Sequence, residues 1–421
     1  MNDRQQAPLT EKRRLGNWMP AKEHAAAAFR RGLAAQAAAR NPGNGAAATP
    51  LTGVVRELSD LVHGDAVLRM NLTRAIDEAL AAGYDLGYAS IDELMLIVDY
   101  LMTYAPPFST SEPVATPLNL LLDWPMCMPS GYAVFRDPAF NARLRRVLGY
   151  WCGFLGGPHS RSHLNADSPD GWFCDEARKK MALDEFLCHP SEPYWGFPSW
   201  NAFFTRQFRP GARPVDEPDN HKVIVSACEA SPYDVRENVQ LHDRFWVKSQ
   251  PYSLAEILSG NQQALARRFV GGSVFQGYLS AFNYHRWHAP VAGRIRAAYN
   301  VDGTYYSEVE AEGVDPRGLN DSQGYTTAVA ARAVVAIDCD DPAIGEVVCV
   351  FVGMAEVSSC MIVALPGQHV AKGDELGYFQ YGGSTYCLLF RPGVIESFVP
   401  KPPYRDDAAP LRINSRLATA R

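Results

Sequence analysis

The residues with the clearest chemical potential lie near the C-terminus, in Gly382-Gly-Ser-Thr385. Two adjacent glycines let the backbone bend tightly and leave the carbonyl group before the serine accessible. The Ser384 hydroxyl could attack the carbonyl carbon of Gly383 and convert the amide into an ester. β-Elimination would then split the chain and leave a dehydroalanine, which hydrolyses to a pyruvoyl group. The same tetrapeptide is common in ordinary hairpin turns, so both interpretations stay open on this pattern alone.

Two histidines lie upstream in Phe282-Asn-Tyr-His-Arg-Trp-His-Ala-Pro-Val-Ala-Gly293, a segment rich in β-formers. An imidazole titrates near neutrality, so His288 could take a proton from Ser384 and later return one to a carbanion. A histidine among aromatic residues can also be a structural hydrogen-bonding group. The spacing of His285 and His288 would suit zinc on a helix face, but the following proline and the β-forming surroundings argue against a helix. We expect no metal.

The order of three motifs resembles the phosphatidylserine decarboxylase family, whose members cleave themselves and depend on a pyruvoyl group. These motifs are Tyr-His-x-x-His-x-Pro-x-x-Gly, then Lys372-Gly-Asp-Glu-Leu-Gly377, then Gly-Gly-Ser-Thr. The resemblance extends from about Pro193 to Val399. It implies cleavage between Gly383 and Ser384 and a covalent pyruvoyl cofactor made from Ser384. It also implies that the second histidine, His288, is the general base, with His285 supporting it or facing the substrate.

Relatives carry an aspartate that orients this histidine, as in a Ser-His-Asp triad, within a Pro-x-Asp-Gly setting. Here Glu229 takes that place in Val225-Ser-Ala-Cys-Glu-Ala230, without the proline and the glycine. Glutamate could orient the histidine with its longer side chain. The alternative is that Glu229 is a surface carboxylate without a special role. The resemblance gives supporting places to four further residues: Gly382, Thr385, Glu356 and Ser358, the last two where relatives place a strand beside the site.

The first half of the chain has a helical pattern. Residues 1–48 are low in complexity, so we expect a flexible N-terminus with a short alanine-rich helix; a basic membrane anchor is the alternative, although large apolar residues are sparse there. Residues 49–208 are predicted to form a helical domain. Ser90 with Glu93 is typical of a capping box, and Asp137 before Pro138 indicates another helix start.

The second half has a β-rich pattern after a proline-rich and charged linker at residues 209–222. Strands are expected within 223–225, 245–247, 293–309, 333–337 and 347–365, and one helix over 253–258. The sequence therefore predicts an α+β fold, in which a β-rich sandwich or open barrel at residues 223–421 forms the decarboxylase domain.

Composition limits the partners and the compartment. The 421 residues are 47% hydrophobic, which suits a globular protein, and the net charge of −6 argues against a nucleic-acid partner. Nine cysteines without CxxC pairing indicate reduced thiols. No apolar stretch reaches the ~18 residues of a membrane span, and the N-terminus lacks the apolar core of a signal peptide. We expect a cytoplasmic protein without membrane attachment; a homodimer is compatible with the sequence.

The helical half also resembles the N-terminal extension of soluble L-tryptophan decarboxylases in its segments Asp123-Trp-Pro-Met126, Asp170-Gly-Trp-Phe173 and Ser199-Trp-Asn-Ala-Phe-Phe204. This resemblance implies a pyruvoyl-dependent decarboxylase of a small amino acid substrate, with L-tryptophan giving tryptamine. Decarboxylation of phosphatidylserine to phosphatidylethanolamine is the alternative.

The residues also suggest two other classes of protein. Ser384, His288 and Glu229 could form a hydrolase triad, but Tyr386 stands where the second glycine of a Gly-x-Ser-x-Gly elbow belongs. Pro366 to Gly377 resembles the hairpin of biotinyl and lipoyl carriers. In such carriers the modified lysine lies at an exposed tip, whereas Lys372 precedes a glycine in what is predicted to be a structural turn.

Overall fold

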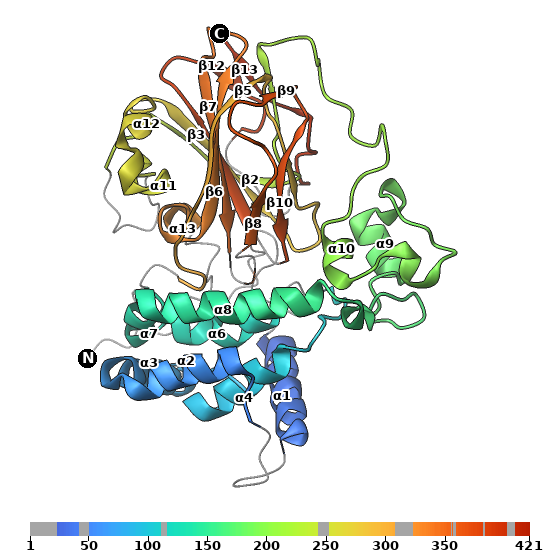
Figure 1. Cartoon of the computed structure of the whole chain (residues 1–421), viewed down its shortest axis with the longest axis vertical. Coiled ribbons are helices and arrows are strands. Elements are labelled where there is room, and N and C mark those ends of the chain that lie inside the picture. The colour runs from blue at the N-terminus through green and yellow to red at the C-terminus, as the bar shows by residue number, and fades with distance from the viewer. Residues whose placement is uncertain are drawn as a thin grey trace, which may run out of the picture.

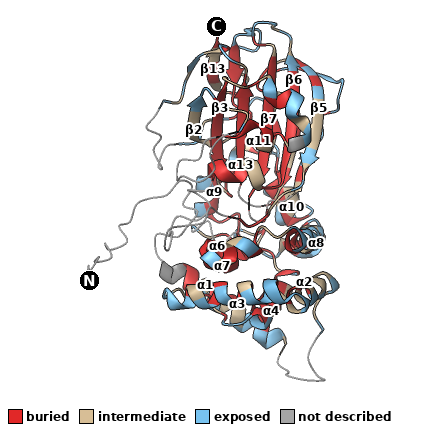
Figure 2. Ribbon diagram, turned by 90° about the vertical axis from the view of Figure 1, so that its left-hand side faces the viewer, coloured by how far each residue is buried: buried red, intermediate tan, exposed pale blue. Residues whose placement is uncertain are grey.

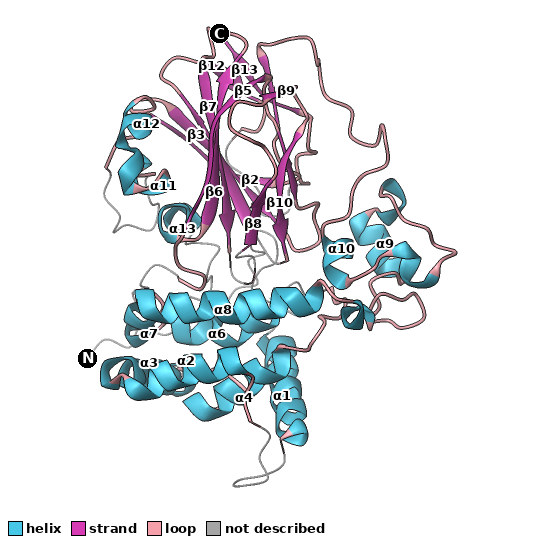
Figure 3. Cartoon of the chain, viewed as in Figure 1, coloured by secondary structure: helices cyan, strands magenta, loops and turns pink. Residues whose placement is uncertain are grey.

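The computed structural model describes residues 23–41, 50–110, 116–242, 252–307, 323–354, 356, 359–381, 384–401 and 409–421. Helices come first along the chain, and a sheet-rich part follows (Figure 1). Figure 3 shows that the two kinds of structure are also separated in space, with the strands standing above the longer helices. The α+β prediction is confirmed, and among the described residues the sheets are open and do not close into a barrel.

The helical part is built from amphipathic helices whose starts follow local capping rules. The Ser90 side chain accepts a hydrogen bond from the amide of Glu93, and Asp137 does the same for Phe140 ahead of a first-turn proline, so both predicted helix starts are confirmed. The helices are α1 (Glu23–Arg40), α2 (Gly53–Gly64), α3 (Ala66–Ala81), α4 (Ile91–Leu101), α6 (Pro117–Cys127), α7 (Pro129–Val134), α8 (Pro138–Leu155), α9 (Asp175–Met181) and α10 (Trp200–Phe204), with 3-10 turns η2 (Pro158–Arg161), η3 (Leu183–Glu185) and η4 (Pro193–Gly196).

The alanine-rich helix expected near the N-terminus is α1. It packs against α4 and places Leu33 and Ala37 in the helical core. Among the described helices, none combines the length and the apolar character needed to cross a bilayer.

The large sheet has seven strands in the described residues, all paired antiparallel, in the order β2-β3-β11-β7-β6-β5-β9. Two three-stranded sheets, β4-β10-β8 and β1-β13-β12, complete the sheet-rich part. The strands are β1 (Val223–Val225), β2 (Ser231–Glu237), β3 (Ser273–Leu279), β4 (Arg286–His288), β5 (Gly293–Val301), β6 (Arg332–Cys339), β7 (Glu346–Gly353), β8 (Ser359–Ile362), β9 (His369–Val370), β10 (Glu375–Gln380), β11 (Ser384–Phe390), β12 (Ile395–Phe398) and β13 (Arg416–Ala420).

Both faces of the large sheet are covered, which is why its central strands are buried along their length (Figure 2). Along β11, Leu388 and Phe390 enter one hydrophobic core, while Cys387 and Leu389 enter the core beneath α11 (Leu254–Ile257) and α12 (Gln263–Arg267). The helix predicted over 253–258 is therefore confirmed as α11. The prediction that it would be alone was wrong, because α12 and α13 (Gln323–Val329) are also helical. The strand predicted at 245–247 lies outside the described residues.

One end of the sheet-rich part joins the core of the helices. The cluster of buried side chains built mainly from α2 to α8 also contains Tyr284, Tyr306, Met354 and Tyr381 from the second half of the chain. In Figure 1 this is the lower end of the sheet-rich part, where β10 ends and β8 begins, beside α8. The predicted domain limits stay a prediction, but the two halves share a continuous apolar contact.

Candidate active site

Ser384 is the first residue of β11, in the middle of the large sheet. It pairs with Leu279 of β3 on one side and with Gly353 of β7 on the other. Its side chain is fully buried, and its hydroxyl group has no hydrogen-bond partner among the described residues. A buried hydroxyl without a partner is costly, so it marks a place where function outweighs stability. Gly382 and Gly383 lie outside the described residues.

The hydroxyl group of Thr385, unlike that of Ser384, is hydrogen-bonded. Its hydroxyl donates to the Gly277 carbonyl at 2.9 Å and accepts from the side-chain amide of Gln276, also at 2.9 Å. Tyr252 in turn donates to the other side of the Gln276 amide at 2.6 Å. Thr385 therefore anchors the start of β11, while the neighbouring Ser384 side chain points to the other face of the strand.

His288 ends β4 and is held by both its backbone and its ring. Its amide donates to the Ala227 carbonyl at 2.9 Å, and Nε2 lies 3.1 Å from the Tyr284 hydroxyl. Burial lowers the pKa of His288 to about 4, against a smaller opposing effect of the Gly373 backbone. The imidazole is therefore neutral at neutral pH, which is the form a general base needs.

Tyr284 is a site residue that the sequence interpretation missed. Burial raises the pKa of its hydroxyl, so the group stays protonated and forms a hydrogen bond with Nε2 of His288, as donor or acceptor according to the tautomer of the ring. Its ring packs against Phe208, with ring centroids 4.4 Å apart, and Phe208 stacks on Phe186 at 4.3 Å. The only signal in the sequence was its place as the first residue of Tyr-His-x-x-His.

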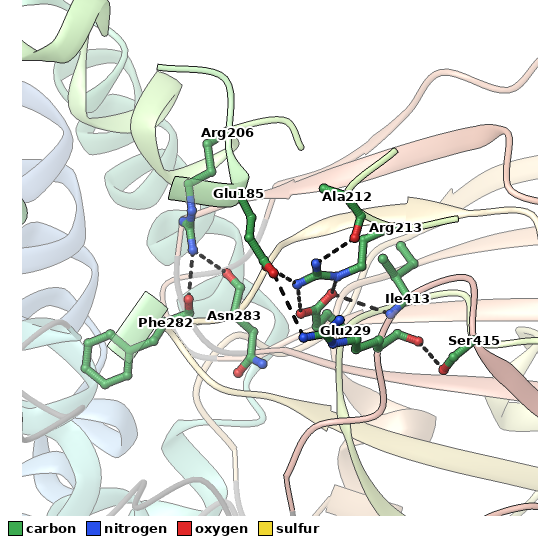
Figure 4. A network of polar contacts seen from close by, with 10 residues as sticks. Glu185, Arg206, Ala212, Arg213, Glu229, Phe282, Asn283, Ile413 and Ser415 are labelled. Atoms are coloured by element: carbon green, nitrogen blue, oxygen red, sulfur yellow. Dashed lines mark hydrogen bonds and ion pairs between the residues drawn. The ribbon is translucent and has the colours of Figure 1, made fainter. Parts of the chain in front are cut away.

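Glu229 is bound by Arg213, as Figure 4 shows. The guanidinium donates to both carboxylate oxygens, at 2.9 and 2.7 Å, and also contacts Glu185 at 2.7 Å. The amide of Ile413 adds a longer contact of 3.4 Å to Glu229. The hydrogen bonds of the described residues therefore do not join Glu229 to His288, and its orienting role stays a prediction. Arg213, from the predicted linker, was not expected in this position.

His285 lies between the two halves of the chain. Its ring stacks on Phe204 of α10 at 4.2 Å, and Nδ1 lies 3.0 Å from the Asn283 carbonyl. Its own carbonyl accepts from the amide of Phe379 in β10 at 2.9 Å. These contacts give it a supporting place and tie β10 to the segment that carries His288.

Glu356 is a buried acid three residues after Gly353, the strand partner of Ser384. One carboxyl oxygen accepts from the amide of Asn119 at 2.9 Å, in the first turn of α6. Burial raises the pKa of Glu356 to about 8; backbone hydrogen bonds oppose this shift, and Asp123 adds to it. The side chain is thus mainly protonated at neutral pH. The other predicted residue of this segment, Ser358, lies outside the described residues.

These residues come from different elements: Ser384 begins β11, His288 ends β4 opposite the start of β10, and Glu356 follows β7 and binds α6. Ser384 and His288 are not in hydrogen-bond contact, since the Ser384 hydroxyl has no such partner among the described residues. Catalytic hydrogen bonds are often longer in a resting site than in the reacting complex. The chain provides a buried hydroxyl at Ser384, a neutral imidazole at His288 and a mainly protonated acid at Glu356, and groups of these types suit proton transfer.

The comparisons with known proteins agree with this chemistry. The phosphatidylserine decarboxylase family matches residues 200–403, and a second family of the same description matches residues 52–181. The chain is 39% identical over 306 residues to "Decarboxylase iboD" of Amanita muscaria, a match that covers 68% of this chain and 87% of that protein. It is 31% identical over 436 residues to "L-tryptophan decarboxylase" of Psilocybe cubensis, covering 98% of this chain and 95% of the relative.

A third relative is "Phosphatidylserine decarboxylase proenzyme 3" of Schizosaccharomyces pombe. The identity is 34% over 202 residues, which cover 48% of this chain and 20% of that protein. The fold, the site and these matches define a decarboxylase, that is, a carboxy-lyase. The chain belongs to the phosphatidylserine decarboxylase family, in a divergent branch whose relatives include proteins named L-tryptophan decarboxylase.

Proposed function

We propose that this enzyme decarboxylates a free amino acid, L-tryptophan to tryptamine, with a pyruvoyl cofactor that it makes from Ser384. The observation that carries the proposal is the buried Ser384 hydroxyl, without a hydrogen-bond partner among the described residues, directly after two glycines. The choice of substrate is supported by the similarity to an L-tryptophan decarboxylase over 98% of the chain. A cytoplasmic location is part of the proposal, supported by nine cysteines that are all free thiols.

In the maturation step, the Ser384 hydroxyl gives up its proton and attacks the Gly383 carbonyl carbon. The carbon–nitrogen bond breaks as the ester forms, and the nitrogen of residue 384 becomes a free amine. Loss of the α-proton of residue 384 expels the Gly383 carboxylate, and one water molecule then converts the dehydroalanine to pyruvoyl with release of ammonia. His288 is the base for the two proton removals, because its imidazole is neutral at neutral pH.

During turnover, a pyruvoyl group at position 384 would supply the carbonyl that binds the substrate amine and accepts the electrons released as CO₂ leaves. The protein's own residues hold and move the protons. His288, positioned by Tyr284, returns a proton to the α-carbon. The mainly protonated Glu356 keeps a negative charge away from the substrate carboxylate, because two neighbouring carboxylates would repel each other.

Phosphatidylserine is the second candidate substrate. It is favoured by the family match to residues 200–403 and by relatives that are named phosphatidylserine decarboxylase proenzymes. These proenzymes match about half of this chain, whereas the match to the L-tryptophan decarboxylase also covers the helical half.

Denaturing mass spectrometry of the wild type beside Ser384→Ala tests cofactor formation before any substrate is chosen. We expect the wild type to show a chain of residues 384–421 with a pyruvoyl-type N-terminus, and the variant to stay intact and inactive. An intact wild-type chain with full activity would overturn the proposal. Release of CO₂ from L-tryptophan, other free amino acids and phosphatidylserine micelles then identifies the substrate, and activity on the phospholipid alone would reverse our choice.

A further inference from the structure

Tyr381 has an unusual backbone conformation three residues before Ser384. Its φ angle is 32°, in the left-handed region that bulky residues seldom adopt. The side chain is nevertheless buried, with 3% of its surface exposed. Such a conformation persists only where the surroundings hold it in place, and it is common at functional sites.

What holds Tyr381 is a set of three aromatic rings from the helical part. Trp151 of α8 and Trp200 of α10 meet the tyrosine ring edge-on, with centroids 5.0 and 4.5 Å away. Phe204 of α10 makes a third such contact at 5.6 Å. Edge-to-face contacts of this kind restrict a ring in both position and tilt.

Two of the three residues that contact the tyrosine ring are themselves held by hydrogen bonds. The indole nitrogen of Trp151 donates to the Tyr104 carbonyl at 2.8 Å, and the amide of Trp200 donates to the Ser160 hydroxyl at 2.9 Å. The residue before Tyr381 is also held from α8, because the Cys152 thiol lies 3.4 Å from the side-chain oxygen of Gln380. The three rings that contact Tyr381 (Trp151, Trp200 and Phe204) therefore belong to the packed core of the helices.

The chain is thus held on both sides of the two glycines. Tyr381 is fixed by helices α8 and α10, while Ser384 is fixed by its pairing with β3 and β7. An intramolecular attack gains most of its speed from the orientation of its reacting atoms, and an error of about 1 Å is costly. Tyr381 and Ser384, on either side of the two glycines, must therefore both be held in position for the attack.

We propose that Tyr381 is a positioning residue for self-cleavage, and that the helical part is required to form the cofactor because its rings clamp this tyrosine. The inference rests on the proposed maturation at Ser384. According to this inference, the helical half of the chain contributes to self-cleavage, in addition to any contribution to substrate selection.

The test follows maturation of the full-length chain over time after cell-free synthesis, by denaturing mass spectrometry. Tyr381→Ala removes the clamped ring, and we expect conversion to two chains to slow at least ten-fold. Tyr381→Phe keeps the ring and should mature within about two-fold of the wild type. Tyr194→Ala is the matched control, because Tyr194 is a second tyrosine with positive φ, 55°, but lies 40% exposed in η4.

Hydroxylamine separates a positioning effect from a general loss of structure. It cleaves the ester intermediate but leaves the Gly383–Ser384 amide intact, so a chain that cannot make the first attack yields no hydroxylamine-dependent fragment ending at Gly383, while cleavage at Asn44-Gly45 is independent of maturation. We expect this result for Tyr381→Ala, together with a cooperative thermal transition. Equal maturation rates in the wild type and Tyr381→Ala would overturn the inference.

If Tyr381→Ala does not fold, Trp151→Leu decides the matter, since it keeps Tyr381 and removes one ring that contacts it without touching His285. Slower maturation of folded Trp151→Leu supports the inference, and an unchanged rate overturns it. A wild-type chain that is active without cleavage would instead remove the proposed function, so the two failures are distinguishable.

Discussion

The hydroxyl group of Tyr284 lies 3.1 Å from Nε2 of His288 and is the hydrogen-bond partner of that ring nitrogen. Sequence comparison with the family had suggested a carboxylate as the orienting group. A neutral hydroxyl has a different effect, because it holds the imidazole without favouring the charged form. The histidine of this branch therefore stays uncharged near neutral pH.

Tyr284→Phe should slow maturation and turnover about five-fold, the effect of one lost hydrogen bond of about 1 kcal/mol. Fold and packing should be kept, because the ring stays against Phe208. Rates from timed mass spectrometry and from CO₂ release provide the measurement. Tyr150→Phe, at an exposed position of α8, is the control and should behave as the wild type. Unchanged rates in Tyr284→Phe would show that the hydroxyl does not orient His288.

Acid should destabilise the protein through His288. The folded pKa of about 4 lies below the unfolded value of 6.5, so the unfolded chain binds more protons between these values. Stability is therefore lost as the pH falls from 6.5 to 4, by up to about 3 kcal/mol. In the Ser384→Ala background, where every chain stays uncleaved, His288→Gln should flatten this part of the pH dependence in urea unfolding; with Ser384 present it should abolish maturation. His221→Gln, at an exposed histidine, is the control variant. A wild-type curve that is level between pH 6.5 and 4 would contradict the prediction.

The raised pKa of Glu356 predicts the opposite pH dependence of folding stability. Its folded pKa of about 8 lies above the ordinary value of 4.5, so the folded chain holds the extra proton and stability falls as the pH rises through this window. Glu356→Gln imitates the protonated side chain, and its advantage over the wild type should grow between pH 5 and 8. Thermal melts at several pH values measure it, with the exposed Glu396→Gln as the control. A constant difference would show that Glu356 does not titrate in this range.

Arg213 and Glu229 should behave as one unit. Removing either partner leaves the other charge poorly solvated, since their side chains are 7% and 14% exposed. We expect Arg213→Ala and Glu229→Ala to cost about 2 kcal/mol each and the double variant clearly less than their sum. Urea unfolding of the four proteins gives the coupling. If Glu229 also supports His288, Glu229→Gln will slow maturation more than Arg213→Met does; equal rates would remove that role.

Local signals in the sequence were sufficient for much of the fold. The caps at Ser90 and Asp137 involve residues only three apart, and the long strands β6 and β7 are continuous apolar runs. The short helices α12 and α13 were missed because they have only one or two turns and lack a clear apolar period. Their helical state depends on packing against the sheet.

The candidate site was only partly predictable for the same reason. Motif order identified Ser384 and His288, whose chemistry is carried by the residue types themselves. The partners of these groups come from distant segments: Glu229 meets Arg213 from the predicted linker, and Tyr381 meets Trp200 from the helical half. Trp200 and Phe204 could be predicted as core residues, but no periodicity shows which tyrosine they enclose.

The place of β11 gives maturation a structural consequence. A cut before Ser384 would leave residues 384–421 with a strand hydrogen-bonded along both edges and buried on both faces, and with β13 paired between β1 and β12. The two polypeptides would therefore stay associated in water. The shorter one could dissociate only if the sheet around it unfolded. After unfolding, the longer chain would have to rebind the shorter chain from solution to restore its central strand β11. Refolding of the two separate chains should therefore be harder than folding of the uncleaved chain.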